Sequence, residues 1–201
     1  MNKLVYLIIL VLMVSCKNKK QDIDNNVSFY PDKAYFEQEK LVKIDIKKQQ
    51  MNFKNLVDSI DSIYDGDLIP FIEINSKNEL RKIVPYRNDY GLFVEKNILV
   101  ITEDSILKDN NYSFKELNSM LLKHYTNNGK LPYYPEHYNK ASIEISLDTN
   151  SKSDVLISTL NKVIDEFEVV NSAIDDSLTL RIGFSYLRQI PPPPPPPKRN
   201  H

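Results

Sequence analysis

Apolar and polar residues alternate in several short stretches of the chain, which is the pattern of strands with one buried face. In residues 41–46, Val42, Ile44 and Ile46 alternate with polar neighbours. Similar stretches predict further strands over residues 68–75, 98–103, 141–148 and 178–184. Because Pro70 has no amide hydrogen to donate, the strand that contains it is expected at the edge of its sheet.

Between these stretches the apolar residues recur with helical spacing. Helices are predicted over residues 52–66, 76–84, 113–129 and 151–170. The third helix begins with a capping box, in which the side chains of Ser113 and Glu116 each accept a hydrogen bond from the other residue's backbone amide. The last helix has the longest apolar stripe of the chain, made of Leu156, Leu160, Val163, Ile164 and Phe167.

Glycine and proline residues predict where three of these helices end. Gly66 and Gly129 each follow a predicted last turn, where a residue with positive φ is expected. Ser76 and Glu79 predict a second capping box at the start of the helix over 76–84. Pro85 is expected to end that helix, because it has no amide to donate.

Each half of the chain thus contains a strand, a capped helix, a strand with an Ile-Glu-Ile sequence and a helix that opens with Ser-Lys. This order favours an internal duplication, although short α/β units also converge on such patterns. The predicted fold is α/β (α+β), with two small strand–helix–strand–helix lobes over residues 29–95 and 96–187. The helices are expected on one face of each sheet.

The first sixteen residues, MNKLVYLIILVLMVSC, differ from the rest of the chain. Lys3 is followed by twelve largely apolar residues, too few to cross a hydrocarbon layer of about 30 Å. The pattern predicts a signal peptide over residues 1–15. Its Met-Val-Ser-Cys ending resembles a bacterial lipobox, which implies that Cys16 is lipidated and becomes the first residue of the mature chain. The alternative is an ordinary signal peptide in which Cys16 has no role.

Residues 16–28 are polar and lack periodicity, and they predict a flexible tether. In the resemblance to bacterial lipoproteins, Lys17 at the second mature position implies the outer rather than the inner membrane of a Gram-negative envelope. The body of the protein is then expected in the periplasm or at the cell surface. Several acyl chains, at roughly 0.8 kcal/mol per buried methylene, would anchor it stably.

The second half of the chain resembles the periplasmic domain of the ExbD/TolR family, whose members work beside proton-driven motor subunits in biopolymer transport. The resemblance covers residues 97–187 and is carried by NILVITEDSIL, SFKELNSMLLKHYTNNGK and KASIEISLDTNSKSDVLISTLNKVIDEF. It implies a strand, a short turn, a helix, a second strand and a longer helix, in that order. The order and spacing of these elements carry the resemblance, because no single motif is diagnostic.

Members of the family also have a membrane helix with an aspartate that handles the proton. The apolar segment of this chain, Leu4 to Ser15, contains no acidic residue, and an intramembrane carboxylate is where proton coupling is expected. The resemblance therefore implies the fold and the envelope context, but not the proton step. We expect an accessory or partner-binding lipoprotein of a proton-motive-force-coupled transport assembly. The alternative is a structural or peptidoglycan-binding envelope lipoprotein unrelated to a motor.

Composition and motifs argue against other classes of function. The 201-residue chain has a net charge of −1, whereas a nucleic-acid-binding domain usually has a basic face. His124, His137 and His201 show no metal-ligand spacing, and the sequence contains no catalytic motif. We therefore expect no enzymatic activity, no cofactor and no metal, and we interpret His124 as a residue of a helix face. An enzyme acting on cell-wall material is the least favoured alternative.

Two segments are candidates for binding a protein partner. Residues 130–139 contain Tyr133, Tyr134 and Tyr138, which either form a recognition surface or pack this loop over the sheet. Residues 188–201 contain a run that favours a stiff polyproline II helix, the alternative being an unstructured tail. This run consists of Pro191, Pro192, Pro193, Pro194, Pro195, Pro196 and Pro197.

The expected partners follow from these segments and from the resemblance. They are the membrane through the lipid anchor, an ExbB/TolQ-like or TonB-like protein or peptidoglycan, and a second copy of the chain in a homodimer. No nucleic acid is expected among them.

Overall fold

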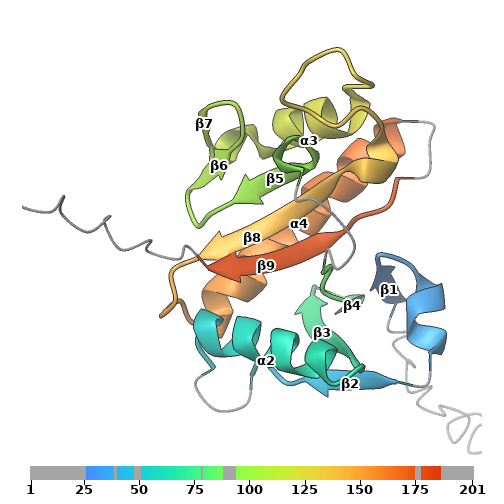
Figure 1. Cartoon of the computed structure of the whole chain (residues 1–201), viewed down its shortest axis with the longest axis vertical. Coiled ribbons are helices and arrows are strands. Elements are labelled where there is room, and N and C mark those ends of the chain that lie inside the picture. Colours follow the sequence, from blue (N-terminus) through green and yellow to red (C-terminus); the bar gives the residue numbers. More distant parts are fainter. Residues whose placement is uncertain are drawn as a thin grey trace, which may run out of the picture.

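The computed structural model describes residues 26–38, 40–47, 51–77, 79–87, 94–174 and 178–186. The predicted signal peptide, Cys16 and the polyproline run lie outside these residues. Within them the protein has an α+β fold with two sheets (Figure 1), which confirms the predicted fold class.

The first sheet has four strands in the order β1-β4-β3-β2. Strands β1 and β4 run parallel, as do β2 and β3, whereas β3 and β4 form an antiparallel hairpin. The elements of this half are β1 (Asn26–Tyr30), the 3₁₀ helix η1 (Lys33–Glu37), β2 (Leu41–Ile44), α2 (Phe53–Asp65), β3 (Ile69–Ser76) and β4 (Glu79–Ile83).

The second sheet has five strands in the order β7-β6-β5-β8-β9, of which β5, β8 and β9 are parallel. The predicted capping box of Ser113 and Glu116 is present at the start of η3, which continues into α3. The elements of this half are η2 (Glu95–Asn97), β5 (Ile98–Ile101), β6 (Ser105–Leu107), β7 (Asn111–Ser113), η3 (Phe114–Glu116), α3 (Leu117–Thr126), η4 (Tyr138–Lys140), β8 (Ser142–Leu147), α4 (Ser153–Ala173) and β9 (Ile182–Tyr186).

Helix α4 lies against one face of the second sheet, behind β8 and β9 in the view of Figure 1, and α3 packs beside it. The apolar stripe predicted for α4 is buried, and Leu160, Val163 and Ile164 have no exposed surface. Phe53 of α2 and Ile72 of β3 belong to the same cluster of buried residues as this stripe. The two halves of the chain therefore share one continuous hydrophobic core.

A buried arginine joins the first sheet to α4. Arg81, in β4, is only 3% exposed. Its guanidinium donates hydrogen bonds to Glu79 (Nε–Oε2 2.8 Å), Asn161 (Nη1–Oδ1 3.1 Å) and Asp165 (Nη2–Oδ1 2.5 Å). A buried charge is costly unless it is paired and hydrogen-bonded. This network therefore favours one position of β4 relative to α4.

Residues 76–84 form a strand and not the predicted helix. Ser76 and Glu79 are cross-strand partners at the turn between β3 and β4, where Lys77 has a positive φ of 46°. They close a hairpin instead of forming a capping box. Only the first three elements of the predicted strand–helix–strand–helix repeat therefore occur in the first half.

The helix predicted over residues 76–84 is wrong for a physical reason, which lies in the residues that β4 buries. The positions of this strand that face the core are occupied by Arg81 and Ile83. A charged residue at a buried position hides the alternation of apolar and polar residues that identifies a strand. Pro85 follows the strand and does not end a helix.

The prediction that Pro70 marks an edge strand is also wrong, because β3 lies between β4 and β2. The amide of Ile69 donates to the carbonyl of Lys40 on the β2 side, at 2.9 Å. The next nitrogen, that of Pro70, therefore faces β4. Pairing between β3 and β4 begins only at Ile72. The missing amide hydrogen thus falls where β3 extends beyond its neighbour.

Several element boundaries differ from the predictions. Helix α2 ends at Asp65, and the positive φ of 55° belongs to Asp67, whereas Gly66 has a φ of −87°. Gly129 has the predicted positive φ, of 76°. Strand β1 begins at Asn26, so residues 26–28 belong to the first sheet and not to the predicted tether. No sequence pattern predicted the short strands β1, β6 and β7.

The Arg81 network makes a prediction about stability. Replacing Arg81 by Ala leaves the half-buried carboxylate of Glu79 without its cation and opens a cavity, so we expect the free energy of unfolding to fall by about 3 kcal/mol. Lys82 is the matched control, because it follows Arg81 on the opposite face of β4 and pairs there with Glu73. Replacing Lys82 by Ala is expected to cost less than about 1 kcal/mol. Urea denaturation measures both changes, and equal losses would contradict the role assigned to Arg81.

Candidate functional site

The second sheet has one covered face and one open face. Alternation along β8 directs Ile143 and Ile145 towards the helices, as predicted, and directs Glu144 away from them. The register places Val100 of β5 and Gly183 of β9 on either side of Glu144. Among the described residues, no α-helix covers this side of the sheet (Figure 1). We call it the open face, and it comprises Ile98, Val100, Ser142, Glu144, Ser146, Gly183 and Ser185.

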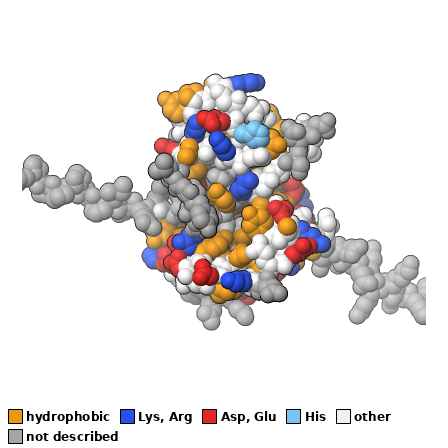
Figure 2. Space-filling view, turned by 45° about the vertical axis from the view of Figure 1, so that its right-hand side comes forward, with side chains coloured by type: hydrophobic (Ala, Val, Ile, Leu, Met, Phe, Trp, Pro, Cys, Tyr) orange, Lys and Arg blue, Asp and Glu red, His pale blue; other side chains and the backbone are white. Residues whose placement is uncertain are grey.

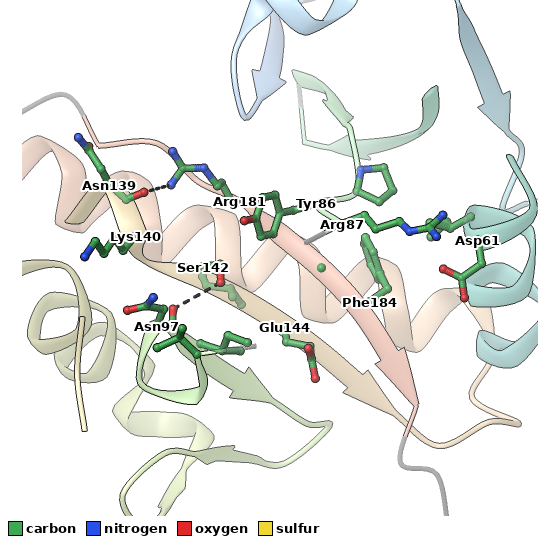
Figure 3. Close-up of a pocket in the computed structure, with 16 residues that line it drawn as sticks. Asp61, Tyr86, Arg87, Asn97, Asn139, Lys140, Ser142, Glu144, Arg181 and Phe184 are labelled. Carbon is green, nitrogen blue, oxygen red and sulfur yellow. Dashed lines mark hydrogen bonds between the residues drawn. The ribbon is translucent and has the colours of Figure 1, made fainter. Parts of the chain in front are cut away.

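A hollow of about 490 Å³ lies where residues 85–87, which follow β4, meet the open face (Figure 3). The amide of Tyr86 donates to the carbonyl of Ile182 at 2.7 Å, which holds this segment against β9. A β-carbon on Gly183 would lie 3.2 Å from the carbonyl oxygen of Tyr86, so the close approach of the segment favours glycine there. We call this cavity the Arg181 hollow, and its wall includes Tyr86, Arg87, Asn97, Lys140, Glu144 and Arg181.

Two of the three cations in the wall of the Arg181 hollow are paired with acidic residues. Arg87 pairs with Asp65 at 2.8 Å, and Lys140 pairs with Glu136 at 3.1 Å. These pairs are exposed to solvent, where an ion pair contributes little to stability. They nevertheless reduce the net attraction that Arg87 and Lys140 offer to an anionic ligand.

The third cation, Arg181, has no acidic partner among the described residues. Its Nη1 donates to the carbonyl of Asn139 at 2.7 Å and to that of Ala141 at 3.4 Å. Figure 3 shows the guanidinium directed towards Asn139, at the end of the hollow away from Asp61. The backbone therefore holds this cation in place while its charge is not neutralised.

Glu144 is the acidic counterpart of Arg181 on the open face. It is half-buried, and it accepts a hydrogen bond from Ser185 Oγ at 2.6 Å. No cation of the described part of the chain forms an ion pair with it. Glu144 lies opposite Gly183 in the sheet, and Arg181 precedes Gly183 by two residues, so the two charges share one face. The backbone positions of Glu144 and Arg181 are offset by two residues, or roughly 7 Å, along the strands.

A second hollow, of about 530 Å³, lies on the other side of Glu144, and its wall also includes Ile98, Lys108 and Tyr133. The ammonium of Lys108 donates to the carbonyls of Lys96 (2.8 Å) and Ile98 (2.6 Å). Burial lowers the pKa of Lys108 to about 8. This value is still above neutrality, so the amine keeps its proton and links η2 to the start of β5.

The structure separates the three tyrosines that the sequence singles out. Tyr134 is buried, and its hydroxyl donates to Asp109 at 2.8 Å. Tyr138 is half-buried, packs against the core and stacks on His137 with 4.2 Å between ring centres. Tyr133 is 63% exposed and borders the second hollow. Packing of the loop thus accounts for Tyr134 and Tyr138, and Tyr133 alone of the three presents a largely exposed ring.

His124 lies inside the protein and has no exposed surface. Its Nε2 is 3.1 Å from the carbonyl oxygen of Ser142, and its Nδ1 has no hydrogen-bond partner among the described residues. Burial, with a smaller contribution from the charge of Lys108, lowers the pKa of His124 to about 3. The imidazole is therefore neutral at physiological pH and part of the core, and it lies on the buried face of α3, in agreement with its interpretation as a residue of a helix face.

The described residues contain no group of three His, Cys, Asp or Glu side chains placed to hold a metal ion. Within the same ranges, no helix has both the length and the apolar character needed to span a membrane. No protein-family model, curated protein or solved structure gives a significant match to this chain. The open face and its two hollows are thus the features on which a function can be argued.

Sequence reasoning identified only part of this site. The Ile-Glu-Ile alternation correctly directs Glu144 away from the core, and the alternation around Ile182 places Arg181 and Gly183 on the opposite side from it. The pairing of β8 with β9, which brings these residues together, is not visible in either segment. The sequence does not indicate Asn97 or Lys108 as residues of the site, because their roles depend on contacts across the sheet.

The buried imidazole makes the protein sensitive to acid. The unfolded chain binds a proton at His124 near pH 6.5, whereas the folded protein does so only near pH 3, so stability is lost as the pH falls between these values. By pH 5 the loss from this group is about 2 kcal/mol. His124→Gln keeps a donor for the Ser142 carbonyl but does not titrate, and it should remove this part of the decline. Denaturation at pH 7 and pH 5 tests this, with the exposed His137→Gln as the control.

Proposed function

We propose that this protein is a lipid-anchored component of a bacterial cell envelope whose role is to bind another protein, and that it has no enzymatic activity. In the resemblance to the ExbD/TolR family, the partner belongs to a proton-motive-force-coupled transport assembly such as an ExbB/TolQ-like or TonB-like protein. The anchor is the lipidated Cys16. The chain serves as an accessory subunit, because its apolar N-terminal segment has no acidic residue to handle a proton.

The observation that carries this proposal is the open face of the second sheet. Among the described residues no α-helix covers this face, so these residues leave it available to a partner, and the two hollows provide concave sites for the partner's side chains. Hydrophobic, acidic and basic side chains are interspersed on the side of the molecule shown in Figure 2. Mixed surfaces of this kind suit a protein partner better than nucleic acid, which requires a basic face.

The order of elements in the second half also supports the proposal. Strand β5, the β6–β7 turn region, α3, β8 and α4 follow one another in the order that the family resemblance implies. A recurring fold is compatible with many functions, however, so this order supports the envelope context more than it supports any particular partner.

The anchor is tested at Cys16. We expect Cys16→Ser to abolish metabolic labelling with a radioactive fatty acid and to move the protein from the membrane fraction to the soluble one. Lys17→Ser is the matched control, because it introduces the same side chain at the neighbouring position but keeps the thiol, and this variant should keep the label. Retention of Cys16→Ser in the membrane fraction would show that another segment anchors the chain.

Partner binding is tested by affinity purification of the full chain from detergent-solubilised envelopes. We expect a defined membrane complex to co-purify, and we expect less of it when Pro191–Pro197 is replaced by a Gly-Ser linker of the same length. The replacement keeps the length of the tail but removes its polyproline II preference. Recovery of the complex at an unchanged level would exclude the proline run as a docking segment. If the wild-type chain recovers only peptidoglycan, the structural alternative is correct.

A further inference from the structure

The unpaired charges of the Arg181 hollow distinguish the open face from the other exposed sheet face of this protein. On the outer face of the first sheet, Glu73 pairs with both Lys43 and Lys82. The rings of Phe29 and Phe71 on that face are packed against Phe36 of η1, with ring centres 5.1 and 5.7 Å apart from it. The outer face of the first sheet therefore satisfies its own charges and covers its own aromatic side chains.

On the open face of the second sheet the charges are not paired. Glu144 and Arg181 carry opposite charges on the same face, yet no ion pair joins them, and no other described residue neutralises either one. The carboxamide oxygen of Asn97, in the wall of the same hollow, is buried and has no hydrogen-bond partner among the described residues. A half-buried charge is more strongly stabilised by a counter-charge than an exposed one is. The hollow thus favours a ligand that carries both signs.

The positions of Glu144 and Arg181 in the sheet indicate the shape of that ligand. Their backbone positions are offset by two residues along the strand direction, or roughly 7 Å, which is the same offset as that of residues i and i+2 on one face of an extended peptide. Gly183, which has no side chain, lies opposite Glu144, and the small Ser146 and Ser185 lie beyond this pair along the strands. A peptide backbone can approach the sheet closely over such residues.

We propose that the Arg181 hollow binds an extended segment of the partner protein, in which a basic side chain and an acidic side chain stand two residues apart. The basic side chain pairs with Glu144 and the acidic one with Arg181. This inference rests on the proposed function, which it deepens by naming the surface and the charge pattern of the segment that it recognises.

The test begins with a phage-displayed library of random linear peptides, selected on the full-length protein. We expect the selected peptides to share a Lys or Arg two residues from an Asp or Glu. Their affinities are then measured by fluorescence anisotropy. Glu144→Gln keeps the acceptor for Ser185 but loses the charge, and it should weaken binding at least tenfold, as should Arg181→Gln.

Exchanging the charges of Glu144 and of the basic residue of the peptide tests whether these two residues pair with each other. Glu144→Lys should abolish binding of a selected peptide, and exchanging the basic residue of that peptide for Glu should restore it. Glu73→Gln on the first sheet is the matched control, because it removes an acidic residue from the other sheet face, and it should change affinity less than twofold. Melting temperatures of the variants show whether each one folds.

Two results would overturn the proposal: no peptide with this pattern is selected, or the selected peptides bind Glu144→Gln and Arg181→Gln as they bind the wild type. The affinity purification separates this outcome from failure of the proposed function. If the wild type and the Glu144→Lys variant recover the same envelope complex, partner binding is correct and the hollow is not its site. If the wild type recovers no protein partner, the proposed function itself fails.

Discussion

Burial of helix α4 is the constraint on which the rest of this structure depends. Its apolar stripe packs against the second sheet, and residues beside the stripe, Asn161 and Asp165, bind Arg81 of the first sheet. Each fully buried aliphatic side chain contributes about 1.5–3 kcal/mol, so the stripe outweighs the polar contacts in energy. The polar contacts are directional, and they select one orientation of the first sheet against the helix.

This arrangement decides where a binding surface can form. Because α3 and α4 occupy one face of the second sheet, no α-helix of the described ranges covers the other face (Figure 1). The segment that follows the end of β4 at Ile83 runs to β9, where the amide of Tyr86 donates a hydrogen bond to Ile182 and Tyr86 forms part of the wall of the Arg181 hollow. The shape of the hollow therefore depends on the position of β4, which the Arg81 network sets. A loss of that network is expected to disturb the hollow even though Arg81 does not line it.

The sequence predicts well the elements whose side chains divide cleanly into apolar and polar faces. Helices α2, α3 and α4 and strand β8 belong to this group, because each buries one face against the core. Strand β4 does not, because Arg81 occupies a buried position that an apolar residue normally fills. Pro70 misleads in a different way, since only the register shows that β4 has already ended beside it. The site escapes prediction for a similar reason, because strand pairing is what places Glu144 and Arg181 on one face of the sheet.

In the proposed binding mode, the unpaired charges of the open face select the segment that binds. A segment that enters the Arg181 hollow removes water from Glu144 and Arg181, and this desolvation costs free energy unless the segment supplies the matching charges. Under this proposal a segment with the wrong pattern binds less tightly even when an apolar side chain packs against Ile98, which also lines the hollow. Two exposed ion pairs elsewhere on the wall, those of Arg87 and Lys140, add little to this selection because solvent already screens them. Under this proposal the discrimination between partners depends mainly on Glu144 and Arg181, which lie in the wall of the same hollow and form no ion pair among the described residues.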